Sequence, residues 1–227
     1  MALDAALLQL ATVPTLRLYS WQPHAVSLGW FQQLADFADL PTTTPLVRRL
    51  TGGGAIHHAD ELTFSLALDA TALPSDVAAS YRLLHDAIVA ALRAIGVSCR
   101  RLDAGEPCGA RPAQRWCFAA PGRDDIVTDR GKLLGSAQRR VHTPHARVLH
   151  HGSLVLERPP LTPFVAALAD QRPADATTRA ELRSHLVAQL AGALRLPWHP
   201  GSATAAELQL AHHLESQYGD GPLLRRR

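Results

Sequence analysis

Residues 131–140 read GKLLGSAQRR and place a lysine, Lys132, in the middle of an apolar strand pattern. Gly131 before it marks a tight turn, and the small-residue run GSA follows it. Burying an unpaired ammonium costs far more free energy than one strand residue contributes. Lys132 is therefore expected to meet an anion or a polarised carbonyl, although an exposed lysine on a hairpin fits the same residues.

Residues 48–58 read RRLTGGGAIHH and indicate the same kind of ligand. The three glycines allow positive φ angles and let backbone N–H groups approach a bound group closely. Arg48 and Arg49 in front of them supply positive charge. A triple glycine also occurs as a plain flexible turn, so this stretch alone does not identify a ligand.

Several further stretches occur with these two in a fixed order. In sequence they are residues 16–21 (LRLYSW), 26–32 (VSLGWFQ), 48–58, 131–140 and 150–154 (HHGSL). Their order and spacing resemble the lipoate-protein ligase and octanoyltransferase family, relatives of the biotin ligases. The resemblance covers nearly the whole chain, starting at residues 1–8 (MALDAALL).

The resemblance implies a fold and a domain organisation. The expected fold is α+β, with a mixed, largely antiparallel sheet flanked by helices, as in class II synthetases and biotin ligases. Residues 1–227 would form a single catalytic domain without an accessory C-terminal domain.

The resemblance also implies two catalytic residues. By residue chemistry alone, Cys117 between two aromatic residues fits a small buried hydrophobe. Octanoyltransferases of the ligase-like type, however, carry a nucleophilic cysteine in a Cys-Phe pair shortly before the glycine-lysine motif, and Cys117-Phe118 stands 15 residues before Lys132. Lys132 would favour the thiolate and stabilise the oxyanion that develops at the acyl carbonyl.

Ten further residues match family positions around the acyl group. They are Arg49, Gly52, Gly53, Gly54, His58, Gly135, Ser136, Ala137, His151 and Gly152. Paired histidines at 57–58, 150–151 and 212–213 do not predict a metal site, because adjacent residues on a strand or helix point apart. No metal is expected among the site residues.

Three functions remain open. The leading hypothesis is transfer of an octanoyl or lipoyl group from acyl carrier protein, through a Cys117 thioester, to the lysine of a lipoyl domain of 2-oxoacid dehydrogenases or of glycine-cleavage H protein. This reaction needs no cofactor. The second is an ATP- and magnesium-dependent lipoate ligase working through lipoyl-adenylate, and the third is a non-catalytic protein that binds a lipoyl or acyl group. Residues 61–63 read ELT, where bacterial ligases carry an asparagine-containing run, and this favours the transferase branch. The glycine-arginine loop of biotin ligases is missing, so biotin is a poor candidate for the ligand.

Composition narrows the class of protein. At 227 residues and 47% hydrophobic content the chain can bury a core, and it contains neither an 18-residue apolar run nor a signal-peptide pattern. We therefore expect a cytoplasmic protein without a membrane partner. The net charge of +3 without a basic, aromatic-rich helix does not predict nucleic-acid binding. A basic rim at Arg139-Arg140 would instead suit acidic carrier and lipoyl domains.

Hydrophobic periodicity predicts the main elements. Helices are expected at 2–11, 33–40 and 75–95 (with Ser75 as N-cap), and after the capping boxes Thr178–Glu181 and Thr204–Glu207. Strands are expected at 16–19, 25–30, 46–50, 61–68 (half-buried), 97–102 (an edge), 116–118, 125–128, 132–138 and 147–156, with a loop at 103–114. Cys99, Cys108 and Cys117 fit neither a disulfide framework nor a zinc spacing, so all three are expected as free thiols.

Overall fold

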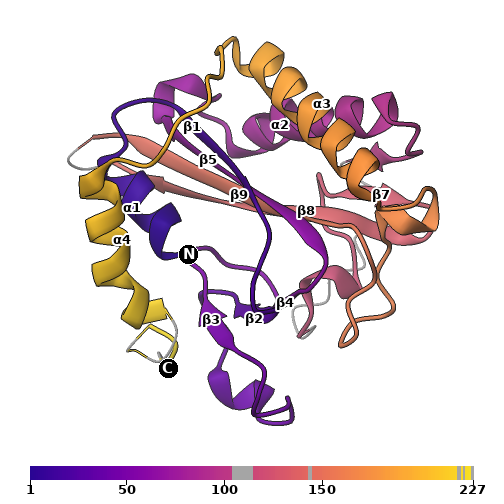
Figure 1. Ribbon diagram of the computed structural model, residues 1–227, viewed down its shortest axis with the longest axis horizontal. Helices are drawn as coiled ribbons and strands as arrows, with labels where there is room; N and C mark the ends of the chain where they lie inside the picture. Colours follow the sequence, from indigo (N-terminus) through magenta and orange to yellow (C-terminus); the bar gives the residue numbers. More distant parts are fainter. Residues whose placement is uncertain (104–114, 143–144, 219–220, 222, 226–227) are drawn as a thin grey trace.

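A computed structural model describes residues 1–103, 115–142, 145–218, 221 and 223–225. Its centre is a six-stranded sheet in the order β1-β5-β9-β8-β7-β6, in which every neighbouring pair is antiparallel (Figure 1). The strands are β1 (Thr15–Tyr19), β5 (Glu61–Asp69), β6 (Arg100–Arg101), β7 (Ile126–Thr128), β8 (Gly131–Val141) and β9 (Arg147–Val155). The expected α+β architecture with a largely antiparallel sheet is confirmed.

Helices cover both faces of this sheet. Helices α2 (Val77–Ala94) and α3 (Ala176–Leu194) lie on one face, and α1 (Ala2–Leu10) and α4 (Ala205–Tyr218) on the other (Figure 1). Short 3₁₀ helices occupy Leu34–Phe37, Ala70–Ala72, Cys117–Ala119 and Leu168–Asp170. The main core lies under α2, where Leu84, Ile88 and Leu92 are fully buried.

A second, three-stranded sheet lies beside α1 and positions the glycine-rich stretch. It contains β3 (Leu46–Arg48), β2 (Ala25–Leu28) and β4 (Ile56–His58), in that order, with a parallel β2–β3 pair. The parallel pair makes the fold mixed, as predicted. The glycines fall in the loop between β3 and β4.

Strand β5 differs from its prediction. Its pattern suggested a half-buried strand, but all residues from Glu61 to Leu68 are buried. The reason is that β5 is an interior strand with helices on both faces, so polar side chains such as Glu61 and Ser65 are buried together with the apolar ones.

Aspartates form the N-caps of the two long helices α2 and α3. Asp76, not Ser75, caps α2 by accepting a hydrogen bond from the Ala79 amide, and Asp175 caps α3, which begins before the predicted box at Thr178. The box at Thr204–Glu207 is confirmed: each residue's amide donates to the other's side chain, at 2.7 and 3.3 Å. An aspartate suits the N-cap position because its carboxylate accepts hydrogen bonds from the unpaired backbone amides of the first helical turn.

The segment at Trp116–Phe118 is not a strand. Residues Cys117–Ala119 form a 3₁₀ turn, and Trp116 makes only an isolated bridge to Ala55. Cys99 and Cys117 carry free thiols, while Cys108 and all of the predicted 103–114 loop except Asp103 lie outside the described residues. Within the described ranges, the helices are too short or too polar to cross a membrane.

Two buried histidines lie between α2 and the sheet. His85 on α2 and His150 on β9 have no exposed surface, and burial lowers the pKa of His85 and lowers that of His150 strongly. The Gln138 amide lies 3.3 Å from His150 Nδ1, and Nε2 of His150 has no hydrogen-bond partner among the described residues. Both rings are therefore held neutral.

This burial predicts acid sensitivity. A lowered pKa in the folded state means that only the unfolded state takes up a proton as the pH falls below about 6.5, so the free energy of unfolding decreases. Between pH 7 and 5 the loss is about 2 kcal/mol for each histidine that stays neutral. We expect His150→Gln to remove that much of the pH dependence, measured by urea unfolding at both pH values.

The matched control is His212→Gln, because the side chain of His212 on α4 is 89% exposed. Its unfolding free energy should follow the same pH dependence as the unmodified protein. Equal pH dependence in the His150 variant and the control would contradict the assignment.

Candidate active site

A pocket forms where the glycine loop, β8 and β9 meet the Cys117 turn. Its lining includes most of the residues predicted for the site: Arg49, Gly52, Gly53, His58, Cys117, Gly135, Ser136, Ala137, His151 and Gly152. The cavity holds about 60 Å³. This is space for a few water molecules, so an acyl chain requires the lining to open.

Cys117 and Lys132 are in direct contact. Lys132 Nζ lies 3.3 Å from Cys117 Sγ and 3.2 Å from the Cys117 carbonyl oxygen, and it is 4.9 Å from the centre of the Phe118 ring. Burial alone would lower the pKa of Lys132, but the charges of Cys117 and Asp125 outweigh it and leave the pKa above its ordinary value. Lys132 is thus a buried ammonium next to a thiol.

Asp125 is the counter-ion of this ammonium, and the sequence analysis did not single it out. Its carboxylate lies 2.8 Å from Lys132 Nζ and accepts a hydrogen bond from the Gly122 amide at 2.6 Å. The lysine itself was the signal for Asp125, because a buried positive charge needs a negatively charged partner. Asp125 is the carboxylate directly before β7, the strand that pairs with β8.

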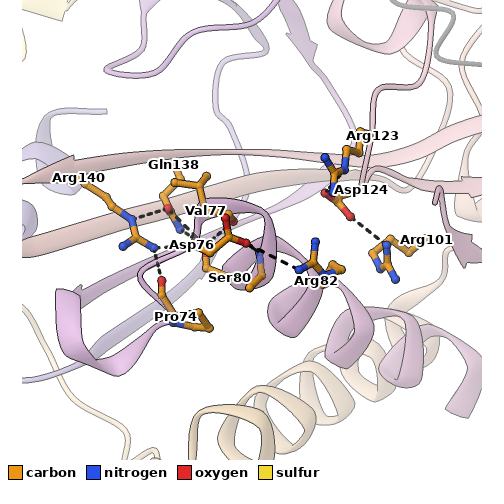
Figure 2. Close-up of polar contacts among 11 residues, drawn as sticks. Pro74, Asp76, Val77, Ser80, Arg82, Arg101, Arg123, Asp124, Gln138 and Arg140 are labelled. Carbon is orange, nitrogen blue, oxygen red and sulfur yellow. Dashed lines mark hydrogen bonds and ion pairs between the residues drawn. The ribbon is translucent and has the colours of Figure 1, made fainter. Parts of the chain in front are cut away.

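Asp124 fixes the backbone next to Asp125. It has a positive φ of 66°, and its carboxylate pairs with Arg101 at 2.9 Å and Arg123 at 3.5 Å. Figure 2 shows Asp124 between these two arginines, on the α2 side of the sheet. The ion pairs of Asp124 hold this turn, and the carboxylate of the neighbouring Asp125 contacts Lys132.

Two glycines provide room for this contact. A Cβ on Gly135 would lie 2.4 Å from Lys132 Cε and 2.6 Å from its Nζ, and one on Gly54 would lie 2.7 Å from the Cys117 backbone nitrogen. Gly54 therefore packs against the backbone of the nucleophile candidate, while Gly135 lies under the lysine. Gly53 has a φ of 96°, which favours glycine at that position.

The two arginines before the loop do different things. Arg49 is buried and donates hydrogen bonds to the carbonyls of Gly52 (2.9 Å) and Gly54 (2.7 Å), so it shapes the loop from inside, and burial lowers its pKa. Arg48 points elsewhere and donates to carbonyls of Gly29, Trp30, Gln32, Leu223 and Leu224. The expectation that both supply charge to the pocket is wrong for Arg48.

The paired histidines divide between two environments, as alternation on a strand requires. His58 lines the pocket, with Nδ1 2.7 Å from Glu61 and Nε2 2.7 Å from the Ser27 hydroxyl. His57 lies outside this pocket, where the Leu161 amide donates to its Nδ1 at 3.4 Å. Glu61 also accepts a hydrogen bond from Ser153 at 3.0 Å.

His151 joins β9 to the glycine loop. Its Nε2 lies 2.7 Å from the Thr51 hydroxyl, and burial lowers its pKa to about 4. It is therefore neutral at physiological pH. The Ser136 hydroxyl is directed to the α2 side, 2.6 Å from His85 Nε2. Gly152 packs against Phe64, since an added Cβ would lie 2.6 Å from that ring.

The predicted basic rim is divided between the two faces of β8. Arg140 reaches the start of α2, where it donates to the Pro74 carbonyl (2.6 Å) and to Gln138 (2.9 Å), as Figure 2 shows. Arg139 lies on the opposite face and donates to the Leu50 carbonyl at 3.1 Å. Within the described ranges, no group of three or more His, Cys, Asp or Glu side chains is placed to hold a metal ion.

Sequence comparisons find relatives among octanoyltransferases. An octanoyltransferase LipM of Exiguobacterium sp. is 40% identical over 153 residues, which cover 63% of this chain and 54% of that protein. The octanoyltransferase LipM of Kyrpidia tusciae is 31% identical over 234 residues, covering 90% of this chain and 84% of the relative. The chain thus matches between about half and five-sixths of the length of these relatives.

Solved structures with the same fold include lipoate-protein ligases. A lipoate-protein ligase A bound with ATP superposes with a TM-score of 0.72 at 23% identity, over 94% of this chain and 87% of that one. A bi-partite lipoate protein ligase from Thermoplasma acidophilum gives 0.65 at 21% identity, over 94% and 85%. The sequence profile of the lipoyl protein ligase A/B catalytic domain matches residues 1–203. With the fold, the sequence relatives and the profile in agreement, this chain belongs to the lipoyl protein ligase A/B catalytic-domain family.

Proposed function

We propose that the protein is an acyltransferase, acting as a single catalytic domain, that moves an octanoyl or lipoyl group from acyl carrier protein onto the lysine of a lipoyl domain or of glycine-cleavage H protein. The observation that carries the proposal is the 3.3 Å contact between Cys117 Sγ and Lys132 Nζ, with Asp125 behind the ammonium. The octanoyltransferase relatives support the same reaction class.

In the first step the Cys117 thiolate attacks the donor's thioester carbonyl. A carbon–sulfur bond forms to Sγ, and the carbonyl oxygen becomes an oxyanion that the Lys132 ammonium stabilises. When the oxyanion collapses, the donor's own carbon–sulfur bond breaks and the carrier leaves as a thiolate. Water protonates this thiolate, which balances the proton that Cys117 released to water when its own thiolate formed. Lys132 remains charged throughout, in keeping with its raised pKa.

In the second step the neutral amine of the acceptor lysine attacks the Cys117 thioester. A carbon–nitrogen bond forms, the bond to Sγ breaks, and one amine proton returns to the thiolate. The Lys132 ammonium stabilises the departing thiolate as it did the attacking one. The reaction needs no cofactor, because the donor thioester already carries the activated acyl group.

The alternative, an ATP-dependent ligase, fits the residues less well. Mg²⁺ prefers carboxylate and other oxygen ligands, yet no Asp or Glu side chain is among the described residues that line the pocket. The nearby Asp125 is engaged by Lys132 and the Gly122 amide. The glycine loop suits a phosphate or a thioester carbonyl equally, so it does not separate the two reactions.

A covalent intermediate is the first prediction of this mechanism. Mixing the protein with octanoyl-acyl carrier protein, without ATP, should add one octanoyl group to its intact mass, and Cys117→Ala should abolish the addition. Cys99→Ala is the matched control, because the Cys99 thiol is buried and its pKa is raised to about 11. It should acylate like the unmodified protein.

Three other outcomes would contradict the transferase mechanism. Full transfer activity in Cys117→Ser would exclude the thioester. Acylation of a lipoyl domain only with free lipoate and ATP would identify a ligase. Inactivity in both assays together with tight binding of a lipoyl domain would indicate a binding protein.

The ammonium and its counter-ion give a second prediction. Lys132→Gln should slow acyl-enzyme formation by about 100-fold or more, the effect of removing one oxyanion donor. Asp125→Asn keeps the shape but removes the charge that holds Lys132, so it should slow the same step by a smaller factor. Rapid-quench mass spectrometry of Cys117 acylation measures the rates of both variants. Asp170→Asn is the control, because Asp170 pairs with Arg158 away from the pocket. If Cys117 in Lys132→Gln were acylated as fast as in the control, an electrostatic role of Lys132 would be refuted.

A further inference from the structure

A second cavity lies further along β8, between α1, the end of β8 and the start of β9. It has a volume of about 470 Å³, and its polar lining is formed by Gln9, Arg139, His145, Arg147 and Tyr218. Two of these side chains are guanidinium groups, and no carboxylate is among the described residues that line it. The cavity is therefore positively charged.

Arg147 has unused hydrogen-bond donors in this cavity. Its Nε and Nη2 atoms are buried and have no hydrogen-bond partner among the described residues. These two N–H groups lie side by side on one edge of the guanidinium, the edge that binds a phosphate or a carboxylate in a bidentate manner. Leaving them unpaired costs free energy, and a bound anion would recover it.

The two arginines are neighbours across a strand pair. Val141 lies opposite Arg147 and Leu149 opposite Arg139, so the two arginines share a face as diagonal neighbours, about 7–8 Å apart. A bound anion would relieve their mutual repulsion. Asp69 lies opposite Arg147 in β5 and interacts electrostatically with Arg147 and His145, but it is exposed and its hydrogen bonds come from the Thr71 amide and hydroxyl, at 2.9 and 2.6 Å.

The cavity continues the active-site face of β8. Gly135 and Ala137 line the active site, and Arg139 and Val141 on the same face line the second cavity. Four to six residues of strand separate Gly135 from these positions, roughly 13–20 Å at ~3.3 Å per residue. A single extended ligand can therefore have one end at Cys117 and the other at Arg147.

From this arrangement we propose that the second cavity binds the phosphate of the arm that carries the acyl thioester. Acyl groups on carrier proteins are thioesters of pantetheine, a long chain whose far end bears a phosphate. The buried Arg147 edge favours a small group at the end of a slender arm over carboxylates on a flat protein surface. The proposal rests on the proposed function and assigns the donor's phosphate to Arg139 and Arg147.

Two donors that differ only in the phosphate test the proposal. The rate of Cys117 acylation is measured with octanoyl-4′-phosphopantetheine and with octanoyl-pantetheine, and the ratio of the two kcat/KM values is the readout. A charge-assisted bidentate contact corresponds to a factor of about 10 or more. We expect Arg147→Gln to lower the ratio by about tenfold and to leave the rate with octanoyl-pantetheine unchanged.

Arg140→Gln is the matched control, because it removes the same charge from the opposite face of β8. It should keep the ratio of the unmodified protein, and Arg139→Gln should lower it. An unchanged ratio in both Arg139→Gln and Arg147→Gln would overturn the proposal. The proposal would also be overturned if Arg147→Gln slowed only the transfer from preformed acyl-enzyme to a lipoyl domain. That result would assign the cavity to the acceptor protein.

A binding measurement keeps this test independent of catalysis. Calorimetric titration should show that 4′-phosphopantetheine binds the unmodified protein about tenfold more tightly than pantetheine, and that Arg147→Gln abolishes the difference. If the protein acylates with neither donor but shows this difference, the transferase mechanism fails and the phosphate site stands. Equal binding of the two compounds would overturn the site.

Discussion

The buried ammonium of Lys132 is the constraint on which the rest of the active site depends. A charge that is only 5% exposed must be compensated by nearby opposite charge or it destabilises the fold. Asp125 provides that charge from the residue before β7, and the arginine pairs of Asp124 hold the turn that presents it. Gly135 leaves the space in which the lysine lies. The same compensation fixes the ammonium against Cys117, so the requirement for stability and the requirement for chemistry are met by one arrangement.

Strand β8 divides the molecule into two functional sides. On one face, Ala137 and Arg139 extend from the active site to the second cavity, between α1 and the end of β8. On the other, Ser136, Gln138 and Arg140 bond to His85, His150 and the start of α2. The alternation of a strand thus lets one ten-residue motif contribute both to a reactive pocket and to a rigid helix–sheet interface.

Much of this arrangement could be predicted from the sequence, because motif order and hydrophobic periodicity are local signals. The glycine loop, the lysine hairpin and the α2 helix all lie where the pattern placed them, and Cys117 does contact Lys132. Arg147 could not be predicted, because its importance arises from strand pairing and burial. For Asp125 the buried lysine signalled that a carboxylate was needed, but only the folded structure selects which one. The division of Arg139 from Arg140, and of His57 from His58, follows from alternation, but which face receives which residue depends on the tertiary structure.

The close packing of Gly54 on Cys117 has a consequence for how this enzyme family can diversify. The Ala55 carbonyl accepts a hydrogen bond from the Cys117 amide at 2.8 Å, and no side chain fits between the loop and the cysteine turn. The glycine loop and the cysteine turn are therefore packed together as one unit. A substitution that widened the pocket by displacing the loop would also displace the sulfur from Lys132. Adaptation of the pocket to other ligands is thus directed away from the glycine loop, toward pocket walls on other elements, such as Thr63 on β5 and Ala137 on β8.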